Sequence, residues 1–268
     1  MNMVSIAVLI CRDSYTQVLD MLKNMISNIV IIEKLGDLGN ISDTMIVLLS
    51  LGCCIEYEKL VKLVNLNTVS SVIEYCPIIR EGILSELRIL DSNNFVLLYS
   101  QPIIGTIRTI IGRSQILLDS IKTIRVILNY NILNDIICLY ENAQLHDNVL
   151  RSRKTLIDYI KNAGTNSGIK QLEIQLSSND GFVEVIVEGI QSDREKKLIY
   201  RITRGDDINQ FIVAEIYSYI QLIINRIVDN GVLIPEDIGR EEGLFTYYMG
   251  MLLNSRKVDI QVNIETIN

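Results

Sequence analysis

The sequence has 268 residues, 49% of them apolar, which is enough to bury a full hydrophobic core and to form two domains. Its 25 Lys and Arg against 32 Asp and Glu give a formal net charge of -7. This balance excludes a broad grip on nucleic acid or on an anionic membrane, because both need a basic face. No apolar run reaches the roughly 18 to 20 residues of a membrane-spanning helix, and the first residues lack the basic segment of a secretory signal. We therefore expect a cytoplasmic protein with neither a membrane nor a nucleic-acid partner.

The cysteine count predicts free thiols. There are five cysteines, with no pair at CxxC spacing, and the single histidine is His146. An odd number without such spacing is typical of a reduced, intracellular protein without a structural zinc site. The cysteines are Cys11, Cys53, Cys54, Cys76 and Cys138. We expect no bound metal.

The first hundred residues alternate short apolar runs with amphipathic segments. Continuous apolar runs are typical of parallel strands that are buried on both faces. Helices are predicted over 15–25 and 58–64, and strands over 5–10, 29–32, 44–49, 69–73 and 95–99. The order β-α-β-β-α-β with a further strand predicts a Rossmann-like, doubly wound α/β domain over residues 1–102.

After Pro102 the predicted strands alternate apolar and polar residues, which indicates a half-exposed, mostly antiparallel sheet. These strands cover 121–128, 170–176, 182–189 and 197–203, and turn signals at 179–181 and 191–195 predict that the last three form a meander. With a helix over 151–162, residues 103–204 are expected to form an α+β mixed-sheet domain for substrate binding or dimerisation.

The last segment, residues 205–268, is expected to return to the first domain. Asp207 is placed to cap a long helix over 208–229, and Asn230-Gly231 would end it. Pro235 is placed to begin a short turn. A helix over 243–253 and an alternating strand over 258–264 complete the chain.

One unit has the layout in which a dinucleotide sits, with a strand ending at Ile10, a helix from Tyr15 and a second strand ending at Ile32. Glu33, which follows the second strand, is placed to accept hydrogen bonds from ribose hydroxyls. The alternative for Glu33 is a solvated strand end. The stretch that should follow the pattern GxGxxG is Cys-Arg-Asp-Ser-Tyr-Thr over residues 11–16.

The three glycine positions of that pattern hold Cys11, Asp13 and Thr16. The glycines allow a tight turn, close approach of phosphate to the backbone, and close packing of helix on strand. Asp13 adds a carboxylate where a pyrophosphate would lie and can cap the helix itself. Cys11, Asp13, Thr16 and Glu33 are therefore predicted to be a degenerate cofactor site that binds neither NAD nor NADP. Cys11 could instead be a reactive thiol at a helix N-terminus or an ordinary small residue at a strand end.

Three segments carry a resemblance to a known family: Gly231-Val-Leu-Ile-Pro-Glu236 after the long helix, Val187-Glu188-Gly189 before a hairpin turn, and Ser100-Gln-Pro-Ile103. The chain resembles the saccharopine dehydrogenase (saccharopine reductase) family. The resemblance implies a Rossmann domain followed by a mixed α+β domain, and an NAD(P)-dependent oxidoreductase acting on an amino-acid-derived substrate. Ile103 replaces a glycine of the family's turn, and the other departures fall on the cofactor site.

Three functions are consistent with these features. The leading hypothesis is a non-catalytic binding or assembly protein that has lost NAD(P). The alternative is an active NAD(P)-dependent oxidoreductase with an atypical phosphate loop. A small-ligand sensor with a cleft between the domains is a third possibility. No catalytic residue is assigned, so whether the protein is an enzyme stays open.

The predicted partners are a small ligand and a second subunit. Arg151 and Arg153 are placed to bind the carboxylate of an amino-acid-like ligand, against the alternative of a solvated helix face. A homodimer through the second sheet, or a pairing with a paralogous subunit, is expected from apolar residues on both of its faces, Val183, Val185 and Val187 on one and Ile186 on the other.

Overall fold

The structure is a computed structural model that describes residues 4–11, 13–41, 45–52, 55–64, 66, 68–75, 95–129, 171–177, 182–204 and 208–267. The chain divides into two compact units. The first comprises Met1–Pro102 with Ile216–Ile234, and the second comprises Ile103–Glu215 with Pro235–Asn268. Among the described residues, no helix has the length and apolar character to cross a membrane.

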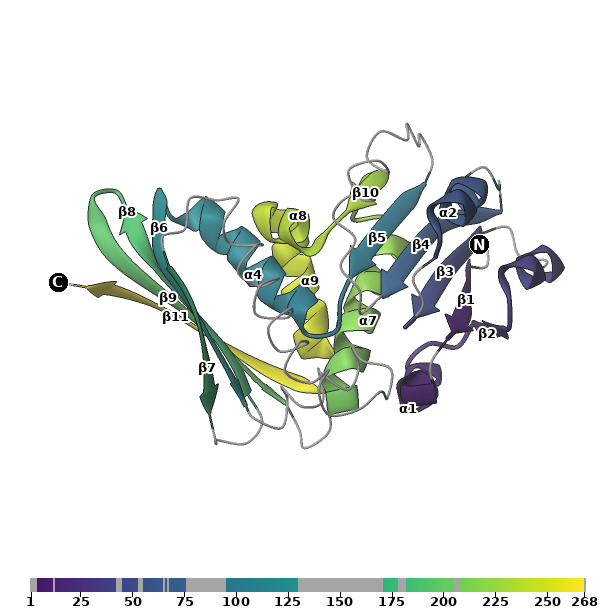
Figure 1. Ribbon diagram of the computed structural model, residues 1–268, viewed down its shortest axis with the longest axis horizontal. Coiled ribbons are helices and arrows are strands. Elements are labelled where there is room, and N and C mark those ends of the chain that lie inside the picture. The colour runs from purple at the N-terminus through teal and green to yellow at the C-terminus, as the bar shows by residue number, and fades with distance from the viewer. Residues whose placement is uncertain are drawn as a thin grey trace, which may run out of the picture. The chain divides into compact units, whose positions relative to one another are not determined.

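The first unit is built on a parallel sheet of six strands in the order β10-β5-β4-β3-β1-β2 (Figure 1). Its strands are β1 (Val4–Ile10), β2 (Ile29–Ile32), β3 (Met45–Leu51), β4 (Val69–Tyr75), β5 (Val96–Ser100) and β10 (Gly231–Leu233). The chain passes from β1 to β2 on one side and then to β3 on the other side of β1. The predicted doubly wound α/β fold is confirmed, and β1, β3, β4 and β5 are mostly buried, whereas the edge strand β2 is half exposed.

Two short helices lie in the described part of this unit, α1 (Thr16–Lys23) and α2 (Tyr57–Val64), with 3-10 turns η1 (Asp13–Tyr15) and η2 (Leu35–Asn40). The second half of α7 (Ile208–Ile224) also belongs to it. Val18, Leu19 and Leu22 form the buried face of α1. The prediction that Asp13 caps this helix is wrong, because η1 intervenes and Tyr15, the N-cap of α1, makes no side-chain capping hydrogen bond.

The second unit contains a five-stranded mixed sheet in the order β11-β9-β8-β6-β7. Its strands are β6 (Ser120–Asn129), β7 (Gln171–Ser177), β8 (Phe182–Gln191), β9 (Arg194–Arg204) and β11 (Val258–Ile267). All pairs are antiparallel except β6 with β7. The predicted meander is therefore wrong for β7, which pairs with β6 and not with β8. Parallel neighbours need a long connection, and the chain has one between β6 and β7. The alternation of apolar and polar residues in β7 does not indicate which strand it pairs with.

Four helices belong wholly or partly to this unit: α4 (Ile104–Leu117), α7 (Ile208–Ile224), α8 (Pro235–Arg240) and α9 (Glu242–Asn254). The division of the chain falls within α7, after Glu215. The helix predicted over 243–253 matches α9 closely, whereas the helix predicted over 208–229 extends beyond the end of α7. No helix was predicted over 104–117, because most of α4 is buried and no polar face marks its helical period.

Helices α4 and α8 touch through their backbones. A Cβ at Gly112 of α4 would lie 2.5 Å from the Glu236 carbonyl oxygen, and one at Gly239 of α8 would lie 2.8 Å from the Arg113 amide nitrogen. Glycine at both positions therefore sets the closeness of this helix pair.

Candidate ligand-binding site

A cavity of about 550 Å³ lies at the carboxyl ends of β1, β2 and β3 in the first unit. In open parallel sheets, ligands bind outside the carboxyl ends of the strands where the strand order reverses, and β1 and β3 flank that point here. The described lining residues come from the ends of these strands and from α2: Leu9, Cys11, Glu33, Lys34, Leu35, Gly36, Ile55, Glu56, Lys59, Lys62, Leu63 and Leu66.

The base of the cavity is apolar. Leu9, Ile55 and Leu63 are buried and belong to the hydrophobic cluster under the carboxyl ends of the strands, with Leu35 packed against it. Leu66 is 44% exposed, so the apolar surface continues toward solvent. Such a lining suits the flat apolar part of a small ligand.

Charged side chains surround this base. Glu33 and Lys34 directly follow β2, and both are exposed. Lys59 pairs with Glu56 at 3.0 Å between Nζ and Oε2, and both side chains are largely solvated. Lys62 lies one turn further along α2. These charged side chains are exposed to solvent, so they can contact a ligand in the cavity.

Two carboxylates, the partly buried Asp37 and the buried Glu74, fix the backbone of the cavity walls. Asp37 of η2 accepts hydrogen bonds from the Glu33 and Lys34 amides at 3.2 and 3.1 Å, which orients the segment after β2. Glu74, buried near the end of β4, accepts from the Ile55 amide at 3.0 Å. The backbone around the cavity is therefore positioned before any ligand arrives.

The turn after β1 holds the three residues that stand in place of glycines. Cys11 lines the cavity, and its amide donates to the Leu51 carbonyl at 3.2 Å. Asp13 is the exposed first residue of η1, and Thr16 is the exposed first residue of α1. Neither is among the lining residues.

Cys11 is disulfide-bonded. The prediction of reduced cysteines is therefore wrong for this residue. Spacing along the sequence could not reveal it, because no CxxC pair marks it and a disulfide depends on which segments the fold brings together. The other four cysteines lie outside the described residues.

The predicted cofactor residues thus separate in space. Glu33 and Cys11 both line the cavity, whereas Asp13 and Thr16 do not. Arg151, Arg153, the predicted helix over 151–162 and His146 lie outside the described residues. The described part of the chain contains no group of three or more His, Cys, Asp or Glu that could hold a metal ion.

Sequence reasoning missed the contribution of α2. Lys59, Lys62 and Leu63 of α2 line the cavity, and their spacing of three and four residues places them on one helical face. Leu66, beyond the end of the helix, also lines the cavity. Because two of the three helix residues are lysines, that face does not show as an apolar stripe. The position of α2 directly after β3 is the signal that could have found them.

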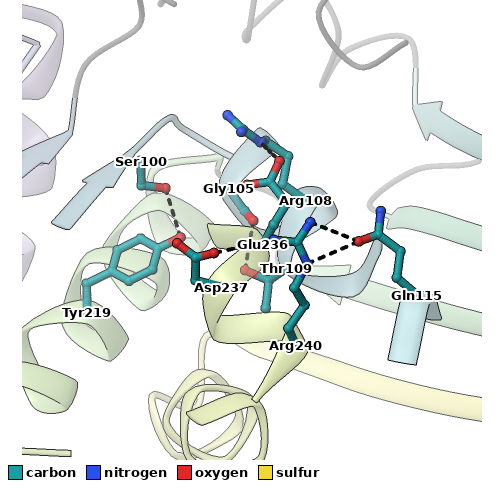
Figure 2. A network of polar contacts seen from close by, with 9 residues as sticks. All are labelled: Ser100, Gly105, Arg108, Thr109, Gln115, Tyr219, Glu236, Asp237 and Arg240. Atoms are coloured by element: carbon teal, nitrogen blue, oxygen red, sulfur yellow. Dashed lines mark hydrogen bonds and ion pairs between the residues drawn. The ribbon is translucent and has the colours of Figure 1, made fainter. Parts of the chain in front are cut away.

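The second unit concentrates polar groups in its interior instead. Arg108 of α4 forms an ion pair with Glu236 of α8, and both side chains are 6% exposed (Figure 2). Oε2 of Glu236 is buried without a hydrogen-bond partner among the residues described. Beside this pair, Arg240 donates from Nε and Nη2 to the Gln115 side-chain oxygen at 3.2 and 3.1 Å.

A second buried carboxylate, Glu215, caps α4. It accepts from the Ile103 amide at 2.7 Å and the Thr106 amide at 3.0 Å, and from the Thr106 hydroxyl, which also contacts the Tyr248 hydroxyl at 2.8 Å. Ile103 has φ 65 and ψ -42, a conformation that favours glycine. Glu215 therefore accepts hydrogen bonds from the backbone amides at the N-terminus of α4, as a bound anion does at other helix N-termini.

Burial raises the pKa of Tyr200 above its usual value near 10, although nearby Arg113 and a hydrogen bond to Ser114 act in the opposite direction. The Tyr200 ring meets Phe245 edge to face at 6.3 Å between centroids. Tyr200, Glu215 and the Arg108–Glu236 pair are thus buried polar groups of the second unit, each with its own partners.

The segments behind the family resemblance have structural roles here. Gly231 has φ 125 and begins β10, Pro235 begins α8, and Glu236 is the buried partner of Arg108. Each of these features belongs to the packing of the fold.

No protein-family model matches the sequence, and no curated protein matches it. Several solved structures, however, are similar to this chain in fold. The dipicolinate-bound dihydrodipicolinate reductase from Paenisporosarcina sp. TG-14 is 11% identical with a TM-score of 0.48, over 88% of this chain and 100% of that chain. A probable dehydrogenase from Thermotoga maritima is 8% identical with a TM-score of 0.36, over 96% of this chain and 98% of that one.

A super-repressor mutant of Gal80p from Saccharomyces cerevisiae is 10% identical with a TM-score of 0.36, over 96% of each chain. None of these three structures is that of a saccharopine dehydrogenase, so the family resemblance stays a prediction. At such identities and TM-scores the likenesses assign neither an activity nor a ligand.

Proposed function

We propose that this chain is a non-catalytic binding protein of Rossmann-like fold that has lost NAD and NADP binding, and that its strand-end cavity binds a nucleoside or a nucleoside monophosphate. The observation that carries the proposal is the division of the cofactor residues. Glu33 lines the cavity, whereas the turn after β1 holds a disulfide-bonded Cys11 and an exposed Asp13 in place of glycines.

The cavity suits the nucleoside part of such a ligand. Its volume of about 550 Å³ lies within the roughly 300 to 1,000 Å³ of small-molecule sites. Glu33 is placed to accept hydrogen bonds from two ribose hydroxyls, as an acidic residue after the second strand does in dinucleotide sites. Leu35, Ile55 and Leu66 supply apolar surface for a base.

The turn after β1 does not suit a pyrophosphate. A pyrophosphate needs close approach to backbone amides at a helix N-terminus, which side chains at the glycine positions obstruct. Asp13 adds a like charge beside that position. A repulsion of about 1.4 kcal/mol alone lowers affinity tenfold.

Three lysines at the cavity favour a single phosphate over a neutral ligand. Lys34, Lys59 and Lys62 line it, against Glu33 and Glu56, and Lys59 pairs with Glu56. Lysine binds phosphate as a flexible point charge, so a monophosphate can be held without a built phosphate loop.

The test is a thermal-shift screen followed by calorimetry with adenosine, adenosine monophosphates, NAD, NADP and their reduced forms. A ligand at 100 times its Kd stabilises the folded state by about 2.7 kcal/mol, which the screen detects. We expect stabilisation by the nucleoside ligands and none by the four dinucleotides. Absence of any shift with the nucleoside ligands contradicts the proposed ligand class.

A pair of variants ties binding to the cavity. Glu33→Gln should weaken nucleoside binding about tenfold or more, because the ribose hydroxyls lose a charged acceptor. Glu58→Gln is the matched control, since Glu58 is an exposed residue of α2 that does not line the cavity. Equal effects of the two changes would place the ligand elsewhere.

The placement of Glu33 also favours a second candidate, an NAD(P)-dependent oxidoreductase with an atypical phosphate loop. The resemblance to saccharopine dehydrogenase implies an amino-acid-derived substrate for such an enzyme. Hydride transfer requires the dinucleotide, so titration with NADH and NADPH separates the two candidates. A Kd in the low micromolar range for either one rejects the non-catalytic proposal.

A further inference from the structure

β11 is the edge strand of the second unit's sheet (Figure 1). It carries exposed apolar side chains. It pairs with β9 along its whole length, from Val258 opposite Arg204 to Ile267 opposite Glu195. No strand pairs with its other side among the residues described. A long edge strand of this kind leaves a row of backbone N–H and C=O groups that another strand can pair with.

The apolar layer of the sheet stops abruptly at β11. Val262 and Ile264 lie opposite Tyr200 and Leu198 of β9, which are each 2% exposed. Val262 itself is 48% exposed and Ile264 is 61% exposed, whereas Val258 at the start of the strand is buried. The stripe of alternating apolar residues therefore continues past the part of the sheet that the chain covers.

The faces of the sheet offer less room for a partner. Val185 and Ile186 of β8 point to opposite faces, and both are buried within a single chain. A second copy cannot gain much by covering them. An interface would have to use the edge of the sheet rather than the faces from which the homodimer was predicted.

We propose that β11 pairs antiparallel with β11 of a second copy about a twofold axis at Asn263, which joins the two sheets into one. In this register Val262 lies opposite Ile264 of the second copy, and Gln261 lies opposite Glu265. Because the twofold axis repeats each pair, the interface contains two apolar pairs and two amide–carboxylate pairs.

Electrostatics selects this register over its neighbour. An axis at Val262 would set Asp259 opposite Glu265 of the second copy twice, and like charges directly opposite one another are destabilising. An axis at Ile264 would shorten the overlap and set Val262 opposite Thr266. The axis at Asn263 keeps both the apolar pairs and the charge compatibility. The inference is independent of the ligand proposed for the first unit.

Sedimentation velocity at micromolar concentration tests the assembly. We expect a particle of twice the chain mass of 30.4 kDa. Ile264→Lys should give a monomer, because it places charge in the apolar pairs, while Ile116→Lys should leave the dimer intact. Ile116 is the matched control as an apolar residue of α4 that is 56% exposed. A monomeric unmodified chain, or a dimer that survives Ile264→Lys, overturns the proposal.

Cysteine cross-linking tests the register by a readout that does not depend on the lysine variant. Under mild oxidation Asn263→Cys should form a covalent dimer on a non-reducing gel, because the two copies of residue 263 face each other. Gln261→Cys should not, because its counterpart is Glu265. The unmodified chain gives the background from the native cysteines. Cross-linking by Gln261→Cys without cross-linking by Asn263→Cys contradicts an axis at Asn263.

Discussion

The strand-end cavity of the first unit and the helix interface of the second unit both contain carboxylates and basic side chains, but they use them in opposite ways. At the cavity, Lys59 and Glu56 are more than half exposed and hold no buried structure in place. At the interface of α4 with α8, Arg108 and Glu236 are almost fully buried and form an ion pair (Figure 2). A dense polar cluster is therefore no sign of a binding site by itself; what distinguishes the cavity is that its charges remain accessible.

The largest expected effect is on the buried ion pair. Arg108→Ala should lower the free energy of unfolding by about 3 to 5 kcal/mol, because it leaves the Glu236 charge buried and unpaired. Arg240→Ala is the control. Arg240 pairs with Asp237 on the surface of the same helix at 3.4 Å, and its loss should cost about 1 kcal/mol or less. Urea denaturation followed by circular dichroism measures both, and equal costs would mean that the buried pair has no special role.

The next effect concerns the contact of α4 with α8. Gly239→Ala should destabilise the protein by about 1 to 3 kcal/mol, because the new Cβ meets the α4 backbone and the helices must separate. Gly250→Ala, in α9, should instead stabilise it by about 0.5 to 1 kcal/mol, since nothing lies within 4 Å of its Cβ and alanine favours a helix. The same denaturation measurement checks both signs. A stabilising Gly239→Ala would refute the close approach.

A smaller effect is expected from the backbone at Ile103. Both Ile103→Ala and Ile103→Gly remove a buried side chain, but only glycine suits φ 65. The glycine variant should therefore be the more stable of the two by about 1 kcal/mol. At Ile116, inside α4, the order should reverse by about the same amount. The same order at both positions would show that the positive φ costs nothing.

The smallest effect on stability is expected at the cavity. Lys62→Gln and Glu33→Gln should each change the free energy of unfolding by no more than about 0.5 kcal/mol, because surface substitutions without fixed partners rarely do more. Nucleoside monophosphate binding should nevertheless weaken in both. Denaturation and calorimetry on the same samples separate the two quantities. A large loss of stability would place these residues with the structural charges of the second unit.

The sequence predicted the parallel sheet well because each strand carries its own signal. Ile6 to Ile10 and Met45 to Leu49 are apolar throughout, and burial on both faces requires that composition. The helix α4 escaped prediction for the same reason, since a helix buried on all sides has no polar face to mark its period. The place of β7 beside β6 depends on pairing between distant segments, which no local pattern contains.

The candidate site divides in the same way. Glu33 could be predicted because its place after the second strand has a fixed role in nucleotide-binding units. The disulfide at Cys11 and the lysines of α2 could not, because both depend on contacts that folding makes between segments distant in the sequence. Asp13 was expected at the helix N-terminus, and the 3-10 turn that displaces it has no distinct signal in three residues.

The passage of the chain between the two units, after Pro102, after Glu215 and after Ile234, limits how the protein can be dissected for expression. A fragment that stops at Pro102 would lack β10, so β5 would become a bare edge of its sheet. It would also lose Tyr219, whose hydroxyl accepts a hydrogen bond from Ser100 at 2.8 Å. A gene for the first unit alone should therefore encode residues 1–102 followed by a flexible linker and residues 216–234.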